Sequence, residues 1–154
     1  MSADFGKLTL TRTIGCTPDR LFPLLTQPEA RAVWGTPSET AVFDILESDP
    51  RPGVYELAGC FRTLHLECLS RTYFLVIDGP NCLICSETIF IEEAPICVSL
   101  ITLEISFSER HSELKVTVQV ASLCGPDMVS GYETGWGTAL DKLAKMAEQP
   151  VTAH

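Results

Sequence analysis

The sequence predicts an α+β domain, in which a meander of antiparallel strands is followed by one long helix. Three observations lead to this class. Apolar residues alternate with polar ones over residues 8–14 and in most of 42–122, turn-forming residues separate these segments, and the apolar period changes to that of a helix after residue 125. No internal repeat, low-complexity tract or long linker divides the chain, so a single domain over residues 1–154 is expected.

The N-terminal part predicts one strand and two short helices. Apolar residues alternate with threonines over residues 8–14, which is typical of a strand. Thr17 offers an N-cap hydroxyl and Pro18 suits the first helical position, so a short helix is expected, and Pro28 ends it. A second short helix is expected over residues 29–34.

Strands are expected over the middle of the chain, at about residues 42–47, 53–61, 64–77, 82–91, 97–108 and 112–122. The segments between them are rich in proline, glycine, aspartate and asparagine, which form tight turns between antiparallel neighbours. Segment 112–122 is apolar on one face and polar on the other, so one of its faces lies in water. Segment 97–108 is apolar on both faces, which predicts a central strand covered on both sides, with Glu104 directed inward.

After residue 125 the pattern predicts a long helix that ends at Pro150. Its apolar stripe consists of Val129, Tyr132, Trp136, Ala139, Leu140, Leu143, Met146 and Ala147. Three glycines lie in its first half, at positions 131, 135 and 137, and each costs up to about 1 kcal/mol relative to alanine in a helix. Three explanations stay open: room for a ligand beneath the helix, close packing of helix on sheet, or fraying near the helix start.

Composition and motifs exclude several function classes. The chain has 11 Lys and Arg residues against 20 Asp and Glu residues, a net charge of −9, and no basic run, so nucleic acid is not an expected partner. The Gly-x-Ser-x-Gly, P-loop and Gly-x-Gly-x-x-Gly motifs are missing, which removes the common hydrolase, NTPase and dinucleotide-binding classes. Neither a signal peptide nor an unbroken apolar run of about 18 residues is found, so a cytoplasmic protein without a membrane span is expected.

Seven cysteines form an odd set, and in a reducing compartment we expect free thiols. Cys82 and Cys85 form an isolated C-x-x-C motif without the second ligand pair of a structural zinc site. On a strand, side chains three apart point to opposite faces, so these two thiols are poorly placed to bind one ion. Neither a metal nor any other cofactor is expected.

Charged residues inside the expected strands are candidates for chemistry. Arg12 shares its face with apolar neighbours, and a structural ion pair with a glutamate is the simplest explanation. The alternative is that Glu87 or Glu104 faces a cavity, where burial suits a carboxyl group to acid–base work. His65 and Glu67 share one face at a spacing that lets a carboxylate orient an imidazole, but alternating polar residues on a half-exposed strand give the same pattern.

Three segments together resemble a known family. Residues 16–34 (CTPDRLFPLLTQPEARAVW) are similar to the opening of the START-like (SRPBCC) branch related to the activator of heat-shock protein 90 ATPase, where a proline-initiated helix leads to Pro-Glu and a tryptophan. Residues 135–144 (GWGTALDKLA) resemble the last helix of that branch, and residues 52–55 (PGVY) resemble its hairpin. The resemblance implies a helix-grip fold, a curved antiparallel sheet of about six or seven strands wrapped around the C-terminal helix, with a cavity between them.

The resemblance implies three classes of function, because this superfamily includes ligand carriers, chaperone partners and cyclases. The first is binding of a small apolar ligand in the cavity. The second is a cochaperone-like module that docks a chaperone partner, and the third is a cyclase-like enzyme that uses Glu87, Glu104 or His65. Whether the protein is an enzyme stays open, as does a homodimer, which rests on fold analogy alone. The predicted ligand-binding residues are Trp34, Tyr55, Phe74, Leu103, Val118, Tyr132 and Trp136.

Overall fold

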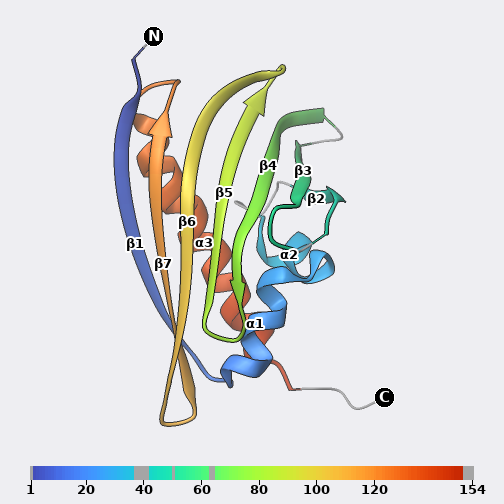
Figure 1. Cartoon of the computed structure of the whole chain (residues 1–154), viewed down its shortest axis with the longest axis vertical. Helices are drawn as coiled ribbons and strands as arrows, with labels where there is room; N and C mark the ends of the chain where they lie inside the picture. The colour runs from blue at the N-terminus through green and yellow to red at the C-terminus, as the bar shows by residue number, and fades with distance from the viewer. Residues whose placement is uncertain (1, 37–41, 50, 63–64, 151–154) are drawn as a thin grey trace.

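The computed structural model describes residues 2–36, 42–49, 51–62 and 65–150, and it has the predicted α+β architecture (Figure 1). The strands are β1 (Asp4–Ile14), β2 (Val42–Glu47), β3 (Tyr55–Arg62), β4 (His65–Asp78), β5 (Cys82–Ile91), β6 (Ala94–Ser108) and β7 (His111–Ser122). The helices are α1 (Pro18–Thr26), α2 (Pro28–Trp34) and α3 (Asp127–Glu148). Two short helices therefore follow the first strand, and one long helix ends the fold, as the helix-grip expectation required.

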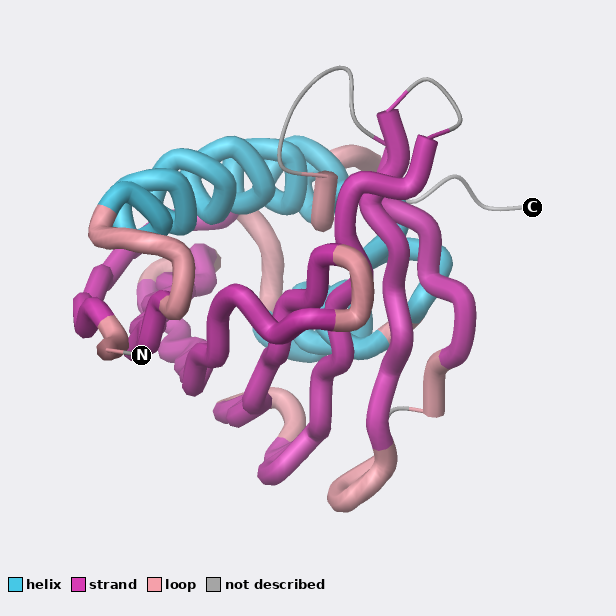
Figure 2. Tube along the Cα trace, turned by 90° about the horizontal axis from the view of Figure 1, so that it is seen from above, coloured by secondary structure: helices cyan, strands magenta, loops and turns pink. Residues whose placement is uncertain are grey.

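The strands form one antiparallel sheet in the order β1-β7-β6-β5-β4-β3-β2. Only β1 leaves the meander order, since it pairs with β7 along its whole length, from Asp4 opposite Ser122 to Ile14 opposite Ser112. Figure 2 shows the strands curving beneath α3, which runs along one face of the sheet. We call the face toward α3 the inner face and the opposite one the outer face.

The core lies on the inner face and joins the sheet to all three helices. On β7 the even-numbered residues from Leu114 to Val120 are buried, and the odd-numbered ones meet water, as the alternation predicted. On α3 the buried residues are Tyr132, Ala139, Leu140, Leu143 and Ala147, all members of the predicted stripe. Residues 17–35 supply a second apolar surface, in which Leu21, Leu25 and Trp34 are buried.

The prediction that β6 is covered on both sides is wrong. Val98 and Leu100 on its outer face are 41% and 37% exposed, whereas Ile101 and Leu103 on its inner face are buried. The reason is that α1, α2 and α3 all pack into the one core on the inner face. Glu104 shares parity with Val98 and Leu100 and is exposed, so the expectation that it points inward is also wrong.

Two further local predictions need correction. Strand β6 begins at Ala94 and not at residue 97, because Pro95 sits next to a register shift between Ile89 and Phe90, a place where the ladder tolerates a residue without an N–H. Thr17 precedes α1 with extended backbone, but its side chain forms no capping hydrogen bond.

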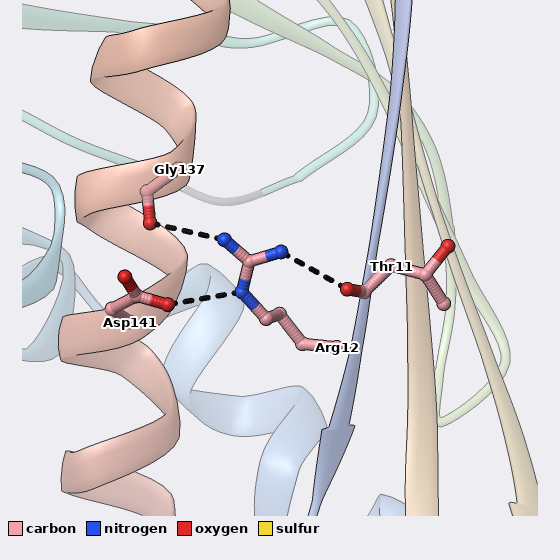
Figure 3. Close-up of polar contacts among 4 residues, drawn as sticks. All are labelled: Thr11, Arg12, Gly137 and Asp141. Atoms are coloured by element: carbon pink, nitrogen blue, oxygen red, sulfur yellow. Dashed lines mark hydrogen bonds and ion pairs between the residues drawn. The ribbon is translucent and has the colours of Figure 1, made fainter.

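Two arginines attach α3 to the N-terminal part of the fold. The Arg12 side chain reaches from β1 to α3, where Nε donates to Asp141 Oδ1 at 3.0 Å and Nη2 donates to the Gly137 carbonyl at 3.4 Å (Figure 3). The expected glutamate partner of Arg12 is therefore wrong, since the partner is Asp141. Near the C-terminal end of α3, Arg20 Nε donates to the Ala147 carbonyl at 2.9 Å.

At the other end of α3 the helix comes very close to β1. A Cβ atom added to Gly6 would lie 2.5 Å from Val129 Cγ1, so only glycine permits this approach. Among the described residues, no helix combines the length and the apolar character needed to cross a membrane.

Candidate functional site: a cavity beneath the C-terminal helix

A cavity of about 260 Å³ lies under the first half of α3. The helix packs mainly against β1, whereas the cavity separates its N-terminal half from β3, β4 and β5. Gly131 and Gly135 line the cavity, and a Cβ atom added to Gly131 would meet open space. Gly137 instead offers its carbonyl to Arg12. Room beneath the helix therefore fits Gly131 and Gly135, but not Gly137.

Aromatic and aliphatic side chains form most of the cavity wall. The rings of Trp34 and Trp136 lie with centroids 6.3 Å apart at an interplanar angle of 45°. The indole N–H of Trp34 donates to the Leu24 carbonyl at 2.8 Å, so the hydrogen-bonding capacity of this ring is used within the helix pair. The remaining apolar lining comes from Phe43, Ala58, Ile89, Met128 and Ala139. Such a wall favours an apolar molecule.

A carboxyl group and a phenol meet on the cavity wall. The Tyr132 hydroxyl donates to Glu87 Oε1 at 2.5 Å, and it lies 3.4 Å from the Ser99 hydroxyl. Burial raises the pKa of Glu87, although the Tyr132 hydrogen bond and Arg31 oppose that shift. Burial, together with the negative charge of Glu87, also raises the pKa of Tyr132, so the phenol keeps its proton. Tyr132 is therefore a fixed donor toward the carboxyl group.

A buried ion pair closes another side of the cavity. Arg31 of α2 lines the cavity and pairs through Nη1 with Oε1 of Glu56, a β3 residue that is 1% exposed. The Ser48 hydroxyl donates to the other carboxylate oxygen of Glu56 at 2.9 Å. The Arg31 guanidinium also lies over the Phe74 ring, 5.7 Å from its centroid. The charge of Arg31 is thus matched by that of Glu56.

Two thiols face each other across the β3–β4 ladder at the cavity. Cys60 and Cys68 are register partners, and both line the cavity. Burial, with a smaller contribution from the neighbouring Cys60, raises the pKa of Cys68 to about 12, so this thiol stays protonated at neutral pH. The seven cysteines form no disulfide. Cys85 is buried and Cys82 is partly exposed, and no group of three or more metal-ligating side chains occurs within the described ranges.

The structure brings together three of the predicted ligand-binding residues, Trp34, Tyr132 and Trp136, which all line the cavity. Phe74, Leu103 and Val118 do not line it but are buried in the core. Tyr55 lies on the outer face, 40% exposed, where its ring centroid is 5.8 Å from that of Tyr73 and the two rings are tilted by 56°. The prediction for Tyr55 differs from the structure because Ala58 and Cys60 are the residues of β3 that face inward, and Tyr55 has the opposite parity.

Several residues of the cavity were missed from the sequence. Arg31 lies in a short helix with too few apolar positions to show which face of that helix is buried. Met128 lies in the first turn of α3. Cys60 and Cys68 carried a signal, since both fall inside expected strands at inner-face parity, but thiols were treated as small apolar residues. Their register pairing depends on the long-range fold.

Of the candidate acid–base residues whose side chains the structure describes, only Glu87 lines the cavity. Glu104 and Glu67 are exposed. The side chain of His65 lies outside the described residues, so its pairing with Glu67 stays a prediction.

Comparison with known proteins gives one family. The sequence profile described as "Activator of Hsp90 ATPase homolog 1-like protein" matches residues 15–148. None of the curated proteins compared matches the chain.

Solved structures share this fold over nearly the whole chain. A protein from Rhizobium loti is 26% identical with a TM-score of 0.81, covering 94% of this chain and 99% of its own. A protein from Rhizobium leguminosarum is 23% identical with a TM-score of 0.84, covering 97% and 98%. A protein from Chromobacterium violaceum is 18% identical with a TM-score of 0.84, covering 94% and 98%.

Proposed function

The chain belongs to the family of activator of Hsp90 ATPase homolog 1-like proteins, and from its cavity we propose that it binds a small, mostly apolar molecule between α3 and the sheet. The observation that carries this proposal is the cavity beneath α3, with aromatic and aliphatic walls and a few polar groups. This is the usual make-up of a small-molecule site, and its volume of about 260 Å³, just below the usual range, favours a small ligand.

The energy of binding would come mainly from apolar burial, at about 25 cal/mol per Å² of surface removed from water. Trp34 and Trp136 supply the largest apolar surfaces, and Glu87 with Tyr132 supplies the polar group that sets the orientation of the ligand. The two glycines of α3 that line the cavity add no side chain to it, at a cost of up to about 1 kcal/mol each in helix propensity.

Native mass spectrometry of freshly purified protein, followed by denaturing analysis of what is released, tests the proposal. We expect a stoichiometric small molecule that is lost in Trp136→Ala and retained in Phe107→Ala, which alters an exposed residue of β6 outside the cavity. An empty native spectrum, together with no thermal stabilisation by a panel of lipophilic compounds, would overturn it.

A specific observation also favours a second function, the docking of a chaperone partner on the outer face. Phe5 is 81% exposed, and it lines an open groove together with Val98 and Leu100. Exposed apolar side chains gathered in this way are typical of interaction surfaces. If this function holds, the chain stimulates the ATPase activity of Hsp90 and Leu100→Ser abolishes the stimulation, while Trp136→Ala leaves it intact. No stimulation by the native chain would rule this function out.

A further inference from the structure

The charges around the cavity do not balance. Two side chains of opposite charge, Arg31 and Glu87, line the cavity, and a third charged residue, Glu56, adjoins it through Arg31. Arg31 forms its ion pair with Glu56, and Ser48 satisfies the second oxygen of that carboxylate. Among the described residues, Glu87 takes part in no ion pair, and its hydrogen-bond donor is the neutral Tyr132 hydroxyl. When Glu87 is ionised, the cavity therefore holds one negative charge without a partner.

Glu87 is partly buried, and a carboxylate that has lost part of its contact with water is costly unless a cation joins it. Because burial disfavours the charged form, it raises the pKa of Glu87. A cation carried by the ligand would supply the missing partner and would hold Glu87 in its ionised form. The Tyr132 hydroxyl already occupies Oε1, which leaves the rest of the carboxyl group to the ligand.

Aromatic rings surround the same space. Trp34, Trp136, Phe43 and Tyr132 all line the cavity, and the two indole rings are tilted toward each other with centroids 6.3 Å apart. The faces of such rings attract cations, tryptophan most strongly, and walls of this kind recognise ammonium groups. A carboxylate and several aromatic rings around one cavity thus favour the same chemical class of ligand head group.

We propose that the molecule bound in this cavity is an amphipathic amine, with its ammonium group at Glu87 among the aromatic rings and its apolar body against Ala58, Ile89 and Met128. This inference rests on the proposed small-molecule function and makes it more specific. A carboxylate head group fits less well, because it would meet the charge of Glu87, and the charge of Arg31 is already matched by that of Glu56. A neutral head group gains hydrogen bonds but no charge pairing.

Three probes of equal chain length test the proposal: octylamine, octan-1-ol and octanoate, titrated calorimetrically at pH 7. We expect octylamine to bind about ten-fold or more tightly than octan-1-ol, with octanoate the weakest. If octan-1-ol or octanoate binds as tightly as octylamine, the inference is overturned and the proposed function stands. If none of the three binds, the proposed function fails together with the inference.

Two variants and one control locate the effect. Glu87→Gln removes the charge and should bring octylamine down to the affinity of octan-1-ol, without changing the latter. Tyr132→Phe removes the hydrogen bond that favours the ionised form of Glu87, so it should weaken octylamine binding and leave octan-1-ol binding unchanged, and it tests the same point if Glu87→Gln does not fold. Glu104→Gln removes an exposed glutamate of the outer face and should change nothing. A preference for octylamine that persists in a folded Glu87→Gln variant contradicts the proposal.

Discussion

Arg31 of α2 and Glu56 of β3 form a buried ion pair beside the cavity, with 14% and 1% of their side chains exposed. The pair connects α2 to β3, the strand whose residues Ala58 and Cys60 line the cavity. It neutralises the arginine that would otherwise dominate the electrostatics of the site. Removal of either partner would leave the other as an isolated buried charge, which is the expensive arrangement for a protein.

Arg31→Met should therefore lower the free energy of unfolding by about 3–5 kcal/mol, because the Glu56 carboxylate loses its cation. The double variant with Glu56→Leu should recover part of this loss. Urea denaturation followed by circular dichroism measures both. Arg51→Met is the matched control, since Arg51 pairs with Asp49 at the surface and its loss should have no measurable effect. Equal effects of Arg31→Met and Arg51→Met would show that the Arg31–Glu56 pair does not act as a buried one.

The Arg12–Asp141 pair should behave as a surface pair, because the side chains are 29% and 67% exposed. Asp141→Asn should cost less than about 1 kcal/mol at low ionic strength, and the effect should shrink in 1 M salt. Thermal unfolding at the two salt concentrations measures the change. Glu133→Gln, at another exposed position of α3, provides the reference. A loss of stability that is large and independent of salt would be incompatible with this interpretation.

Two glycine-to-alanine substitutions should have opposite effects. Gly131→Ala should stabilise the protein by up to about 1 kcal/mol, because the added methyl group enters open space and the helix gains propensity. Gly6→Ala should destabilise it by about 1–3 kcal/mol, because the new Cβ would lie 2.5 Å from Val129 Cγ1. Chemical denaturation of both variants side by side tests the pair. Stabilisation by Gly6→Ala would contradict the close approach of α3 to β1.

The cysteines should react with iodoacetamide at very different rates. Cys124 is exposed and should be alkylated first at pH 8. Cys68 and Cys85 should react slowly, because burial raises the pKa of each to about 12 and the thiolate is the reactive form. Peptide mapping by mass spectrometry over time gives the order. Early modification of Cys85 in the folded protein would argue against its buried position.

Stability should depend on pH through Glu87. Its pKa in the folded state is raised above its ordinary value of 4.5, so the folded state binds the proton more tightly than the unfolded state does. The stabilising contribution is complete below pH 4.5 and is lost as the pH rises through the folded pKa. Glu87→Gln carries no such proton, so its stability relative to the native protein should improve from pH 4 to pH 7. A constant difference across this range would contradict the raised pKa.

The sequence predicted the elements well because the periodicity of apolar residues is a local property. Leu114 and Val116 alternate with polar residues, and that pattern alone placed one face of β7 in the core. It did not show what covers a face: Val98 and Leu100 belong to an apolar pattern as strong as that of a buried strand, yet no described element packs over them. Coverage depends on where the helices lie, which is a property of the whole chain.

The same limit explains the candidate site. The resemblance indicated where the helices of Trp34 and Trp136 lie, and both residues line the cavity, while their contact with a ligand stays a prediction. Phe74 lies on the expected face of its strand but is fully buried in the core, and alternation does not distinguish a core residue from a cavity-lining residue on the same face. Arg12 and its partner Asp141 are 129 residues apart, so no local pattern could identify the pair.

The arrangement of the indole rings has a practical consequence. The chain contains two tryptophans, and both line the cavity, where their ring centroids lie 6.3 Å apart. The intrinsic fluorescence of the protein, excited at the red edge of the indole band, therefore arises entirely from the walls of this site. A molecule that enters the cavity changes the polarity around both tryptophans, so the fluorescence of the native protein reports directly on ligand binding.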